Sequence, residues 1–297
     1  MKKFISILLV LVLALGLVAC GSGSSATKMT MGTGGTSGTY YGYGGVLGQY
    51  IKNHAGIEVT VVSTDGSKAN IQGIASGDYQ LGTVQSDVMA YAWEGTRSFE
   101  SDGKVDSFRV VAGLYAEAVQ LVTMDPEIKS VADLAGKSVS IGAPGSGVYF
   151  NAIDVLTAAG LTESDINAQY QSFADSADAL KDGKIDAAFI VAGAPTPAIT
   201  ELCTTNNAYL VPIDGAIADK LMADCPFYTT YAIPQAPTMA RPRMLPPLPL
   251  RQLSSFPLPL RKMMFTTSPR LSSITSTPSP RRMVRVPSSA SRMQPAV

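Results

Sequence analysis

Thr30-Met31-Gly32-Thr33-Gly34-Gly35-Thr36-Ser37-Gly38-Thr39-Tyr40-Tyr41 is the most informative segment of this chain. Residues 30–33 predict a short strand that runs into glycines, and helical spacing of apolar residues follows. The glycines allow backbone N–H groups to approach a ligand, and the start of a helix concentrates unpaired N–H donors. With the added hydroxyls, the segment suits an anion without any lysine or arginine. A tight turn with ordinary helix capping is the alternative interpretation.

The same pattern occurs a second time along the chain. Residues 138–141 predict a strand, Gly142-Ala143-Pro144-Gly145-Ser146-Gly147 follows it, and residues 148–159 predict a helix. Two such loops on facing edges of two similar lobes would suit a ligand with two anionic groups, such as a dicarboxylate. We therefore expect the two loops to face one another.

Strands and helices alternate through most of the chain. Further strands are predicted at residues 57–63, 81–84, 108–115, 118–124 and 187–191, and further helices at 68–76, 88–93, 131–135, 176–181 and 197–205. This alternation predicts an α/β fold with largely parallel sheets.

The charge is divided between two unlike segments. The 297 residues carry no formal net charge. Residues 1–234 hold 13 basic and 23 acidic residues, a balance of −10, whereas residues 235–297 hold 10 basic and no acidic residues, a balance of +10. The overall charge therefore averages two segments and says nothing of partners.

The last 63 residues, 235–297, differ from the rest in composition. They hold 12 of the 19 prolines and lack glycine, aspartate and glutamate. Proline-rich basic sequence without apolar periodicity predicts a disordered tail. A shift of the reading frame explains the abrupt change, and a basic tail for membrane phospholipid is the alternative.

The N-terminus predicts export. Lys2 and Lys3 precede an apolar stretch, and small residues lead to Cys20. Leu17-Val18-Ala19-Cys20 resembles a bacterial lipobox, which implies a signal peptide at residues 1–19, lipidation of Cys20 and a flexible tether at residues 20–27. The alternatives are an ordinary signal peptide or a short membrane helix.

Two cysteines remain beyond the anchor, Cys203 and Cys225. In an exported protein they can form a disulfide, which would be worth roughly 3 kcal/mol for a loop of about 20 residues. Two separate thiols are the alternative.

The chain resembles the TAXI family of solute-binding proteins, the extracytoplasmic receptors of one class of tripartite (TRAP) transporters. The first loop resembles the family's opening signature, and the resemblance covers residues 29–234 in order. It continues through Val84-Gln85-Ser86-Asp87-Val88, Ala112-Gly113-Leu114-Tyr115, residues 131–137, the second loop, residues 182–187, Gly193-Ala194-Pro195 and Pro226-Phe227-Tyr228.

The resemblance implies a two-lobed type II periplasmic-binding-protein fold with a cleft and a hinge. Residues 28–117 would form the first lobe, 118–214 the second, and 215–234 would return toward the first. Because the tail does not resemble the family's closing segment, the first lobe is expected to be incomplete. The family implies a glutamate-like or dicarboxylate ligand, permease subunits as membrane partners and a monomer.

The resemblance also implies the contact residues. They are Thr36, Ser37, Gly38, Thr39 and Tyr40 of the first loop, Gln85 and Ser86 opposite, Gly145, Ser146 and Gly147 of the second lobe, and Tyr115 as a wall. Asp87 and Glu117 are candidates to pair with a ligand ammonium group, and an ordinary helix cap or surface acid is the alternative interpretation for each. Gly42 and Val148 depart from the family, which usually has Pro and Thr at these positions.

Enzyme signatures are scarce. The single histidine, His54, lies in a predicted solvated helix end, and neither a Gly-x-Ser-x-Gly motif nor a phosphate-binding Gly-x₄-Gly-Lys-Ser/Thr motif is present. We expect no enzyme activity, no cofactor, no metal and no nucleic-acid partner. Two alternatives stay open: a type II receptor that delivers a sulfonate or a pyrimidine precursor to an ATP-driven importer, and a structural or adhesion lipoprotein at the cell surface.

Overall fold

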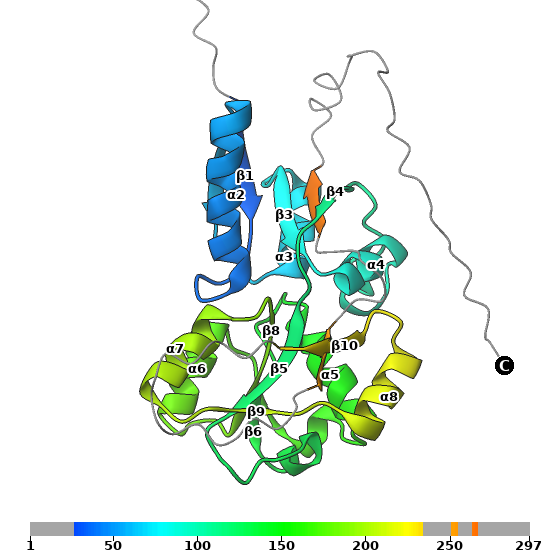
Figure 1. Cartoon of the computed structure of the whole chain (residues 1–297). Helices are drawn as coiled ribbons and strands as arrows, with labels where there is room; N and C mark the ends of the chain where they lie inside the picture. Colours follow the sequence, from blue (N-terminus) through cyan, green and yellow to red (C-terminus); the bar gives the residue numbers. More distant parts are fainter. Residues whose placement is uncertain (1–26, 234–250, 255–262, 267–297) are drawn as a thin grey trace, which may run out of the picture. The chain divides into compact units, whose positions relative to one another are not determined.

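The computed structural model describes residues 27–233, 251–254 and 263–266 (Figure 1). The predicted signal peptide, Cys20 and most of the tether lie outside these residues, as does most of the tail. None of the described helices is both long and apolar enough to cross a membrane. For residues 251–254 and 263–266 we describe the backbone only.

The first sheet has five strands in the order β2-β1-β3-β12-β4. We call the part of the chain built on it lobe 1. Its elements are β1 Lys28–Gly32, α2 Thr39–Ala55, β2 Glu58–Val62, α3 Ser67–Ser76, β3 Leu81–Val84, α4 Ser86–Glu94, η1 Arg97–Phe99, β4 Arg109–Gly113 and β12 Met263–Thr266.

The second sheet has seven strands, with β10-β11-β5-β8-β6-β7 in order and β9 paired with β5. We call this part lobe 2. Its elements are β5 Ala118–Thr123, η2 Val131–Leu134, β6 Ser138–Ser140, α5 Val148–Ala158, η3 Glu163–Asp165, β7 Asn167–Gln169, α6 Phe173–Lys181, β8 Ala187–Ala192, α7 Pro197–Thr205, β9 Tyr209–Val211, α8 Gly215–Asp224, β10 Thr229–Ala232 and β11 Arg251–Ser254.

The α/β class is confirmed, but the sheets are mixed rather than largely parallel. β1 pairs in parallel with β2 and β3, and β6 with β7 and β8. β5 instead runs antiparallel to β8 and β9. Within the sheet of lobe 2, the connections β6-α5-β7 and β7-α6-β8 contain helices, which return their strands in parallel, whereas β5 enters this sheet directly from β4 of the other sheet.

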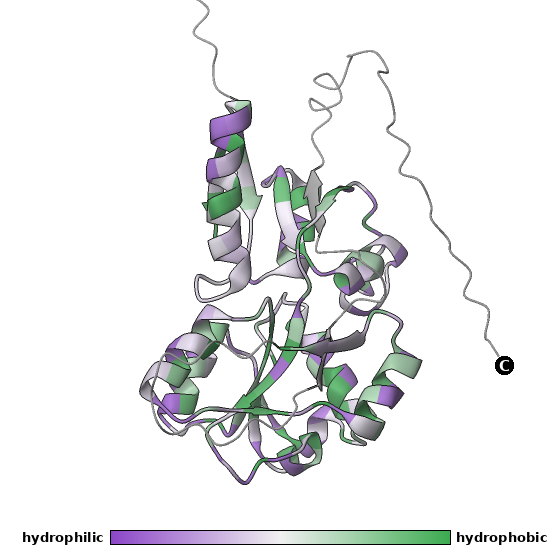
Figure 2. Ribbon diagram, in the orientation of Figure 1, coloured by the Kyte–Doolittle hydropathy of each residue, from purple (hydrophilic) through white to green (hydrophobic). Residues whose placement is uncertain are grey.

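The core of lobe 2 covers both faces of its sheet. Leu121 and Phe189 belong to a buried cluster with α5 and α8, whereas their neighbours Val122 and Ile190 belong to a cluster with α6 and α7. This alternation follows from the two-residue period of a strand. Figure 2 shows the hydrophobic residues along β5.

The two faces of this sheet also correct the predicted disulfide. Cys203 lies on α7 and Cys225 follows α8, and both are free thiols. α7 and α8 pack on opposite faces, so the sheet separates the two sulfur atoms. Sequence distance alone does not reveal this separation.

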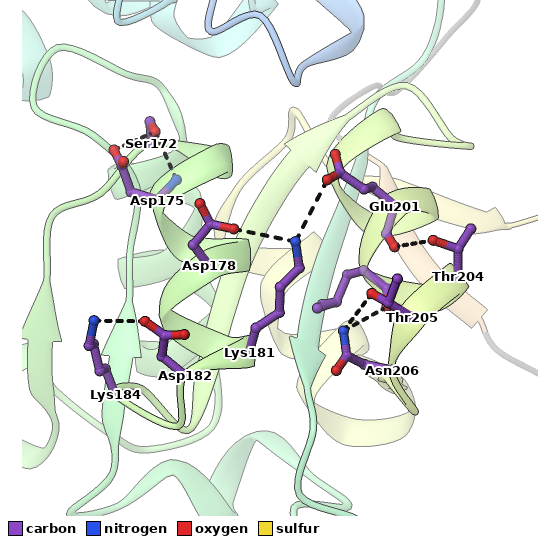
Figure 3. A network of polar contacts seen from close by, with 11 residues as sticks. Ser172, Asp175, Asp178, Lys181, Asp182, Lys184, Glu201, Thr204, Thr205 and Asn206 are labelled. Carbon is purple, nitrogen blue, oxygen red and sulfur yellow. Dashed lines mark hydrogen bonds and ion pairs between the residues drawn. The ribbon is translucent and has the colours of Figure 1, made fainter.

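A polar network lies on the outer surface of α6 and α7 (Figure 3). Lys181 Nζ reaches Asp178 Oδ1 at 3.3 Å and Glu201 Oε1 at 3.7 Å. Exposed ion pairs of this kind contribute roughly 0–1 kcal/mol each. The network therefore belongs to the solvated side of lobe 2.

Helix α2 packs closely on the sheet of lobe 1. A Cβ at Gly44 would lie 2.8 Å from Thr33 Cγ2, so only glycine allows this approach. Met31 and Val61 lie beneath the same turn of the helix. The buried cluster of lobe 1 includes Ile71, Val84 and Phe99.

Residues 215–234 do not mainly return toward lobe 1. Ala218 and Leu221 of α8 belong to the buried cluster of lobe 2, because this apolar face packs against α5. β10 pairs with β11 in the sheet of lobe 2. Within the described part of this segment, Phe227 is the residue that packs against the buried cluster of lobe 1.

The tail differs from the predicted disorder at two places. β11 pairs antiparallel with β10 and meets β5, and β12 lies between β3 and β4. Neither four-residue stretch contains proline, so each offers the backbone donors and acceptors that a ladder needs. Composition averaged over 63 residues hides such short stretches.

Candidate functional site

A cavity of about 320 Å³ lies between lobe 1 and lobe 2. Most of its lining comes from loops that join a strand to the following helix. Lobe 1 contributes Gly34, Gly35, Thr36, Ser37, Gly38, Thr39, Tyr40, Ser63, Thr64, Asp65, Gly66, Ser67, Gln85 and Glu117, and lobe 2 contributes Ala143, Ser146, Gly147, Val148, Gln171, Ser172, Phe173, Ala174, Val191 and Ala192.

The first loop is held from within lobe 1. Thr33 donates both its N–H and its hydroxyl to Val62 O, at 3.1 and 2.6 Å. The fully buried Asn70 donates its amide to Thr33 O at 2.6 Å and to Thr83 O at 2.8 Å. The start of the first loop is therefore anchored at Thr33 to β2 and α3.

The start of α2 has no side-chain cap. Gly38 is the N-cap residue, and its N–H donates to Gly35 O at 2.9 Å in a tight turn. Because Gly38 has no side chain, the N-cap residue contributes no side-chain cap to the helix. The hydroxyl of Thr39 donates instead to Gly193 O of lobe 2 at 2.8 Å. A helix start of this kind at a cavity wall is suited to an anionic group.

The second loop bonds across the gap between the lobes, as the first loop does where Ser37 O accepts from Ala198 N of α7 at 3.1 Å. Gly145 O accepts from Lys68 N at 3.0 Å and Ala69 N at 3.3 Å, both in the first turn of α3 in lobe 1. The loop therefore occupies the helix N-terminus across the gap between the lobes. Ser146 and Gly147 line the cavity beside this contact.

Eight of the eleven predicted contact residues line the cavity. They are Thr36, Ser37, Gly38, Thr39, Tyr40, Gln85, Ser146 and Gly147. Ser86, Tyr115 and Gly145 do not line it.

Each of the three exceptions has a local reason. Ser86 opens α4, where successive side chains point about 100° apart, and its neighbour Gln85 takes the cavity side. The ring of Tyr115 lies over Gly193 and 5.2 Å from the ring of Tyr43. Gly145 is turned toward α3, whose first N–H groups its carbonyl accepts.

Sequence reasoning missed two groups of lining residues. One is Ser63-Thr64-Asp65-Gly66-Ser67 between β2 and α3, and the other is Gln171-Ser172-Phe173-Ala174 between β7 and α6. The first group repeats the signal of the two recognised loops, a strand followed by Ser, Thr and Gly and then a helix. The same rule applied there would have found it.

The cavity contains acceptors as well as donors. Asp65 and Glu117 are its acidic lining residues, and no lysine or arginine is among the described residues that line it. Glu117 is 2% exposed, and Tyr40 donates its hydroxyl to Glu117 Oε2 at 3.4 Å. Burial, followed by the field of Tyr115, raises the pKa of Tyr40 well above its usual value, so this hydroxyl stays protonated. Gln171 Oε1 is buried with no hydrogen-bond partner among the described residues.

Asp87, a candidate partner for a ligand ammonium group, lies behind the cavity wall. It is 1% exposed and accepts from Val88 N at 2.9 Å and from Asn151 Nδ2 at 2.9 Å. Burial raises the pKa of this carboxyl above its usual value. Of the two acidic candidates, Glu117 is the one that reaches the cavity.

Metal chemistry has no built site in the described part of the chain, where no three His, Cys, Asp or Glu side chains form a group that would hold an ion. His54 stacks on Tyr50 at the exposed end of α2, far along the helix from the first loop. The polar lining of the cavity consists of amide, hydroxyl and carboxylate groups, most of them on loops.

Solved structures of periplasmic binding proteins resemble the fold of this chain. The aliphatic sulphonate binding protein SsuA of Escherichia coli is 19% identical, with 63% of this chain and 57% of that chain covered and a TM-score of 0.42. The alkanesulfonate-binding SsuA of Xanthomonas axonopodis is 17% identical, with 84% and 68% covered and a TM-score of 0.49. The GluR0 ligand-binding core with L-glutamate is 13% identical, with 67% and 92% covered and a TM-score of 0.44.

The chain spans little more than half the length of the E. coli protein, and these likenesses concern the fold alone. The family comparison is more extensive. A model of the NMT1-like family matches residues 31–240, which include both loops and every residue that lines the cavity. The chain belongs to the NMT1-like family.

Proposed function

We propose that this chain is a solute-binding protein that captures a small carboxylate bearing an amino group, such as glutamate, and delivers it to a membrane transporter. One observation carries the proposal: the cavity brings the start of α2, with its glycine N-cap, together with the buried carboxylate of Glu117 and the buried, unpaired Oε1 of Gln171. A ligand with both an anionic and an ammonium group satisfies both sides.

The volume supports a small solute. About 320 Å³ lies at the lower end of the range for small-molecule sites, roughly 300–1,000 Å³. Val148, Phe173 and Val191 give the cavity an apolar wall beside its polar groups. The ligand's carboxylate would lie at the first loop and its ammonium group beside Glu117.

Two transporter classes are candidates for the membrane partner. The TAXI-like motifs support a tripartite TRAP-type permease. Membership of the NMT1-like family favours the second candidate, an ATP-driven importer. Among the structures of similar fold, one is described as the substrate-binding protein of an amino acid ABC transporter, and the E. coli and Xanthomonas proteins bind sulfonates.

The proposal includes the location of the protein in the cell. Residues 1–19 would be removed as a signal peptide and Cys20 would carry the lipid anchor, which would place a monomeric receptor at the outer surface of the cell membrane. Catalysis, a cofactor and nucleic-acid binding play no part in the proposed role.

A thermal-unfolding screen of the chain tests the ligand. The panel contains L-glutamate, L-glutamine, 2-oxoglutarate, succinate, alkanesulfonates and an aminopyrimidine. A bound ligand at 100 times its Kd adds about 2.7 kcal/mol, which raises the Tm by roughly 5–10 °C. Stabilisation by glutamate and not by 2-oxoglutarate supports the proposed ligand. Stabilisation only by sulfonates or pyrimidines supports the second candidate, and no stabilisation by any solute contradicts both.

Glu117→Gln tests the ammonium contact. The change keeps the size of the side chain and removes its charge, so affinity for glutamate should fall by about tenfold or more, or about 1.4 kcal/mol. Affinity for a dicarboxylate without an amino group should stay equal or rise, because a negative charge is lost. Isothermal titration calorimetry with both solutes measures the difference. An equal loss of affinity for both solutes would contradict a contact between Glu117 and the ammonium group of the ligand.

A further inference from the structure

A chain of buried polar side chains joins the two lobes behind the cavity. Asn151 of α5 in lobe 2 is fully buried. Its Oδ1 accepts from Gln85 Nε2 at 2.7 Å, and its Nδ2 donates to Asp87 Oδ2 at 2.9 Å and to the Tyr228 hydroxyl at 2.7 Å. One amide of lobe 2 therefore holds both residues that flank Ser86 at the start of α4 in lobe 1.

This series of hydrogen-bonded side chains continues to an ion pair. Tyr228 donates its hydroxyl to Asp154 Oδ2 at 3.0 Å, and Asp154 Oδ1 lies 2.6 Å from Arg97 Nη2 of lobe 1. Arg97 also donates to the Tyr91 hydroxyl at 3.1 Å and lies over the Phe150 ring. Burial lowers the pKa of Arg97, but the hydrogen bond and charge of Asp154 outweigh it and hold the pKa above its usual value.

Gln85 connects this series of hydrogen-bonded side chains to the ligand cavity. It is 3% exposed and lines the cavity. Its N–H donates to Ser67 Oγ at 3.1 Å, and Ser67 donates to its Oε1 at 3.4 Å. Because Gly147 has no side chain, Oε1 fits against it. Gln85 is thus fixed by Asn151 on one side and by the cavity wall on the other.

These groups are satisfied only while the lobes are in contact. Asn151 donates to and accepts from lobe 1 with both ends of its amide, and Asp154 pairs with a lobe 1 cation. Separation of the lobes would break these contacts of Asn151 with Gln85 and Asp87 and of Asp154 with Arg97, and would expose the groups to water. A network of this kind favours two discrete arrangements rather than a gradual opening.

We propose that Asn151 is a positioning residue for ligand binding, which latches α5 of lobe 2 to α4 of lobe 1 and thereby holds Gln85 against the ligand. Asn151 does not itself line the cavity. The inference rests on the proposed function for the identity of the ligand, whereas the predicted contact between the lobes does not depend on which ligand binds.

Asn151→Asp tests the latch with little change in size. The new carboxylate would face Asp87 at the distance of the present hydrogen bond, 2.9 Å. Like charges this close repel, so the pair would keep one shared proton at low pH, and loss of that proton as pH rises would force the two carboxylates apart. The titratable groups around it are Asp87 and Tyr91 of α4, Arg97 of η1, Asp154 of α5, and Cys225 and Tyr228 after α8.

The expected result is a loss of affinity that depends on pH. At about pH 7.5 the variant should bind glutamate at least about tenfold more weakly than the unchanged protein, and at about pH 5.5 the ratio should shrink to within about threefold. A loss of equal size at both pH values, or no loss, would overturn the inference. The matched control is Asn167→Asp on the exposed strand β7, which should leave the ratio near one at both values.

A second variant covers the case in which Asn151→Asp does not fold. Asp154→Asn breaks the ion pair with the partly exposed Arg97 and should weaken binding several-fold at both pH values. Unchanged affinity in this folded variant would overturn the latch.

Small-angle scattering without ligand separates this inference from the proposed function. Asn151→Asp should have a larger radius of gyration at about pH 7.5 than at about pH 5.5, whereas Asn167→Asp should not change. If the unchanged protein binds no solute, the proposed function fails while scattering still decides the latch. If the unchanged protein binds glutamate and the variant's radius stays constant, the latch alone fails.

Discussion

The two glycine-rich loops have similar sequences, and both bond to the opposite lobe. In the first loop, Ser37 O accepts from Ala198 N in the first turn of α7 at 3.1 Å, and Thr39 donates its hydroxyl to Gly193 O. In the second loop, Gly145 O accepts from the first turn of α3. Loop composition therefore predicts proximity to the cavity and to the other lobe, but not how tightly each glycine is packed.

Replacing a glycine by alanine should reduce ligand affinity much more in the second loop than in the first. The loss in the second loop is the largest effect that we expect. In the second loop, a Cβ at Gly147 would overlap Gln85 Oε1 and lie 2.8 Å from Val88 Cγ2. Gly147→Ala must displace Gln85, and affinity for the ligand should fall at least about 100-fold, or about 2.7 kcal/mol.

The matched change in the first loop is Gly38→Ala. Its Cβ would lie 3.2 Å from Gly35 O and 3.5 Å from the Phe173 ring, which a small shift accommodates. Affinity should change by less than about fivefold, or about 1 kcal/mol. Calorimetric titration of both variants compares the loops, and equal losses would mean that both hold the ligand in the same way.

The anchoring of the first loop is open to a stability test. Asn70→Ala removes the donor to Thr33 O and Thr83 O and leaves both carbonyls buried, so the free energy of unfolding should fall by about 2 kcal/mol. The exposed Asn53→Ala on α2 is the control and should stay within about 0.5 kcal/mol. Urea unfolding measures both. A loss at Asn70 no larger than at Asn53 would show that the loop is anchored elsewhere.

The lobe contact near the second loop predicts a smaller dependence on pH. Burial raises the pKa of Asp87 above its usual value, so the folded protein binds this proton more tightly than the unfolded chain. The stabilisation is complete below about pH 4 and is lost as pH rises through the folded pKa. Because a single proton is released, the free energy of unfolding should fall by at most about 1.4 kcal/mol for each unit of pH.

Asp87→Asn should remove this slope from urea midpoints measured between about pH 4 and pH 8. The other groups with shifted pKa values affect the free energy of unfolding outside this pH range. Hydrogen bonds to Ser130 and Thr162 lower the pKa values of Asp133 and Asp165, so these residues act below about pH 4. Burial raises the pKa of Tyr40 and Tyr228, which act above about pH 10. A slope that persists in Asp87→Asn would assign it to another group.

Several elements were predicted at or near their true bounds. β3 at Leu81–Val84 and α7 at Pro197–Thr205 match, because an apolar run and an N-terminal proline are local signals. α8 at Gly215–Asp224 was missed. It is a short helix without acidic residues in its first turn or basic residues in its last, and its packing on α5 supplies what local sequence lacks.

The site divides in the same way. The first-loop residues that were predicted as ligand contacts line the cavity, because glycines and hydroxyls before a helix report local backbone chemistry. Tyr115 and Gly145, which were predicted as contacts too, do not line it, since their orientation depends on Gly193 and on α3, far away in the sequence. Gln171 could not be ranked in advance, because the burial of its side-chain oxygen exists only in the folded chain.

The sequence by itself determined the alternation of strands and helices and the chemistry of each loop, because these depend on residues within one or two turns of each other. Tertiary structure decided the direction of β5, the separation of Cys203 from Cys225 and the packing of the two loops. These features depend on which surfaces meet across a sheet or between lobes. Burial and pairing at those contacts are properties of the whole fold.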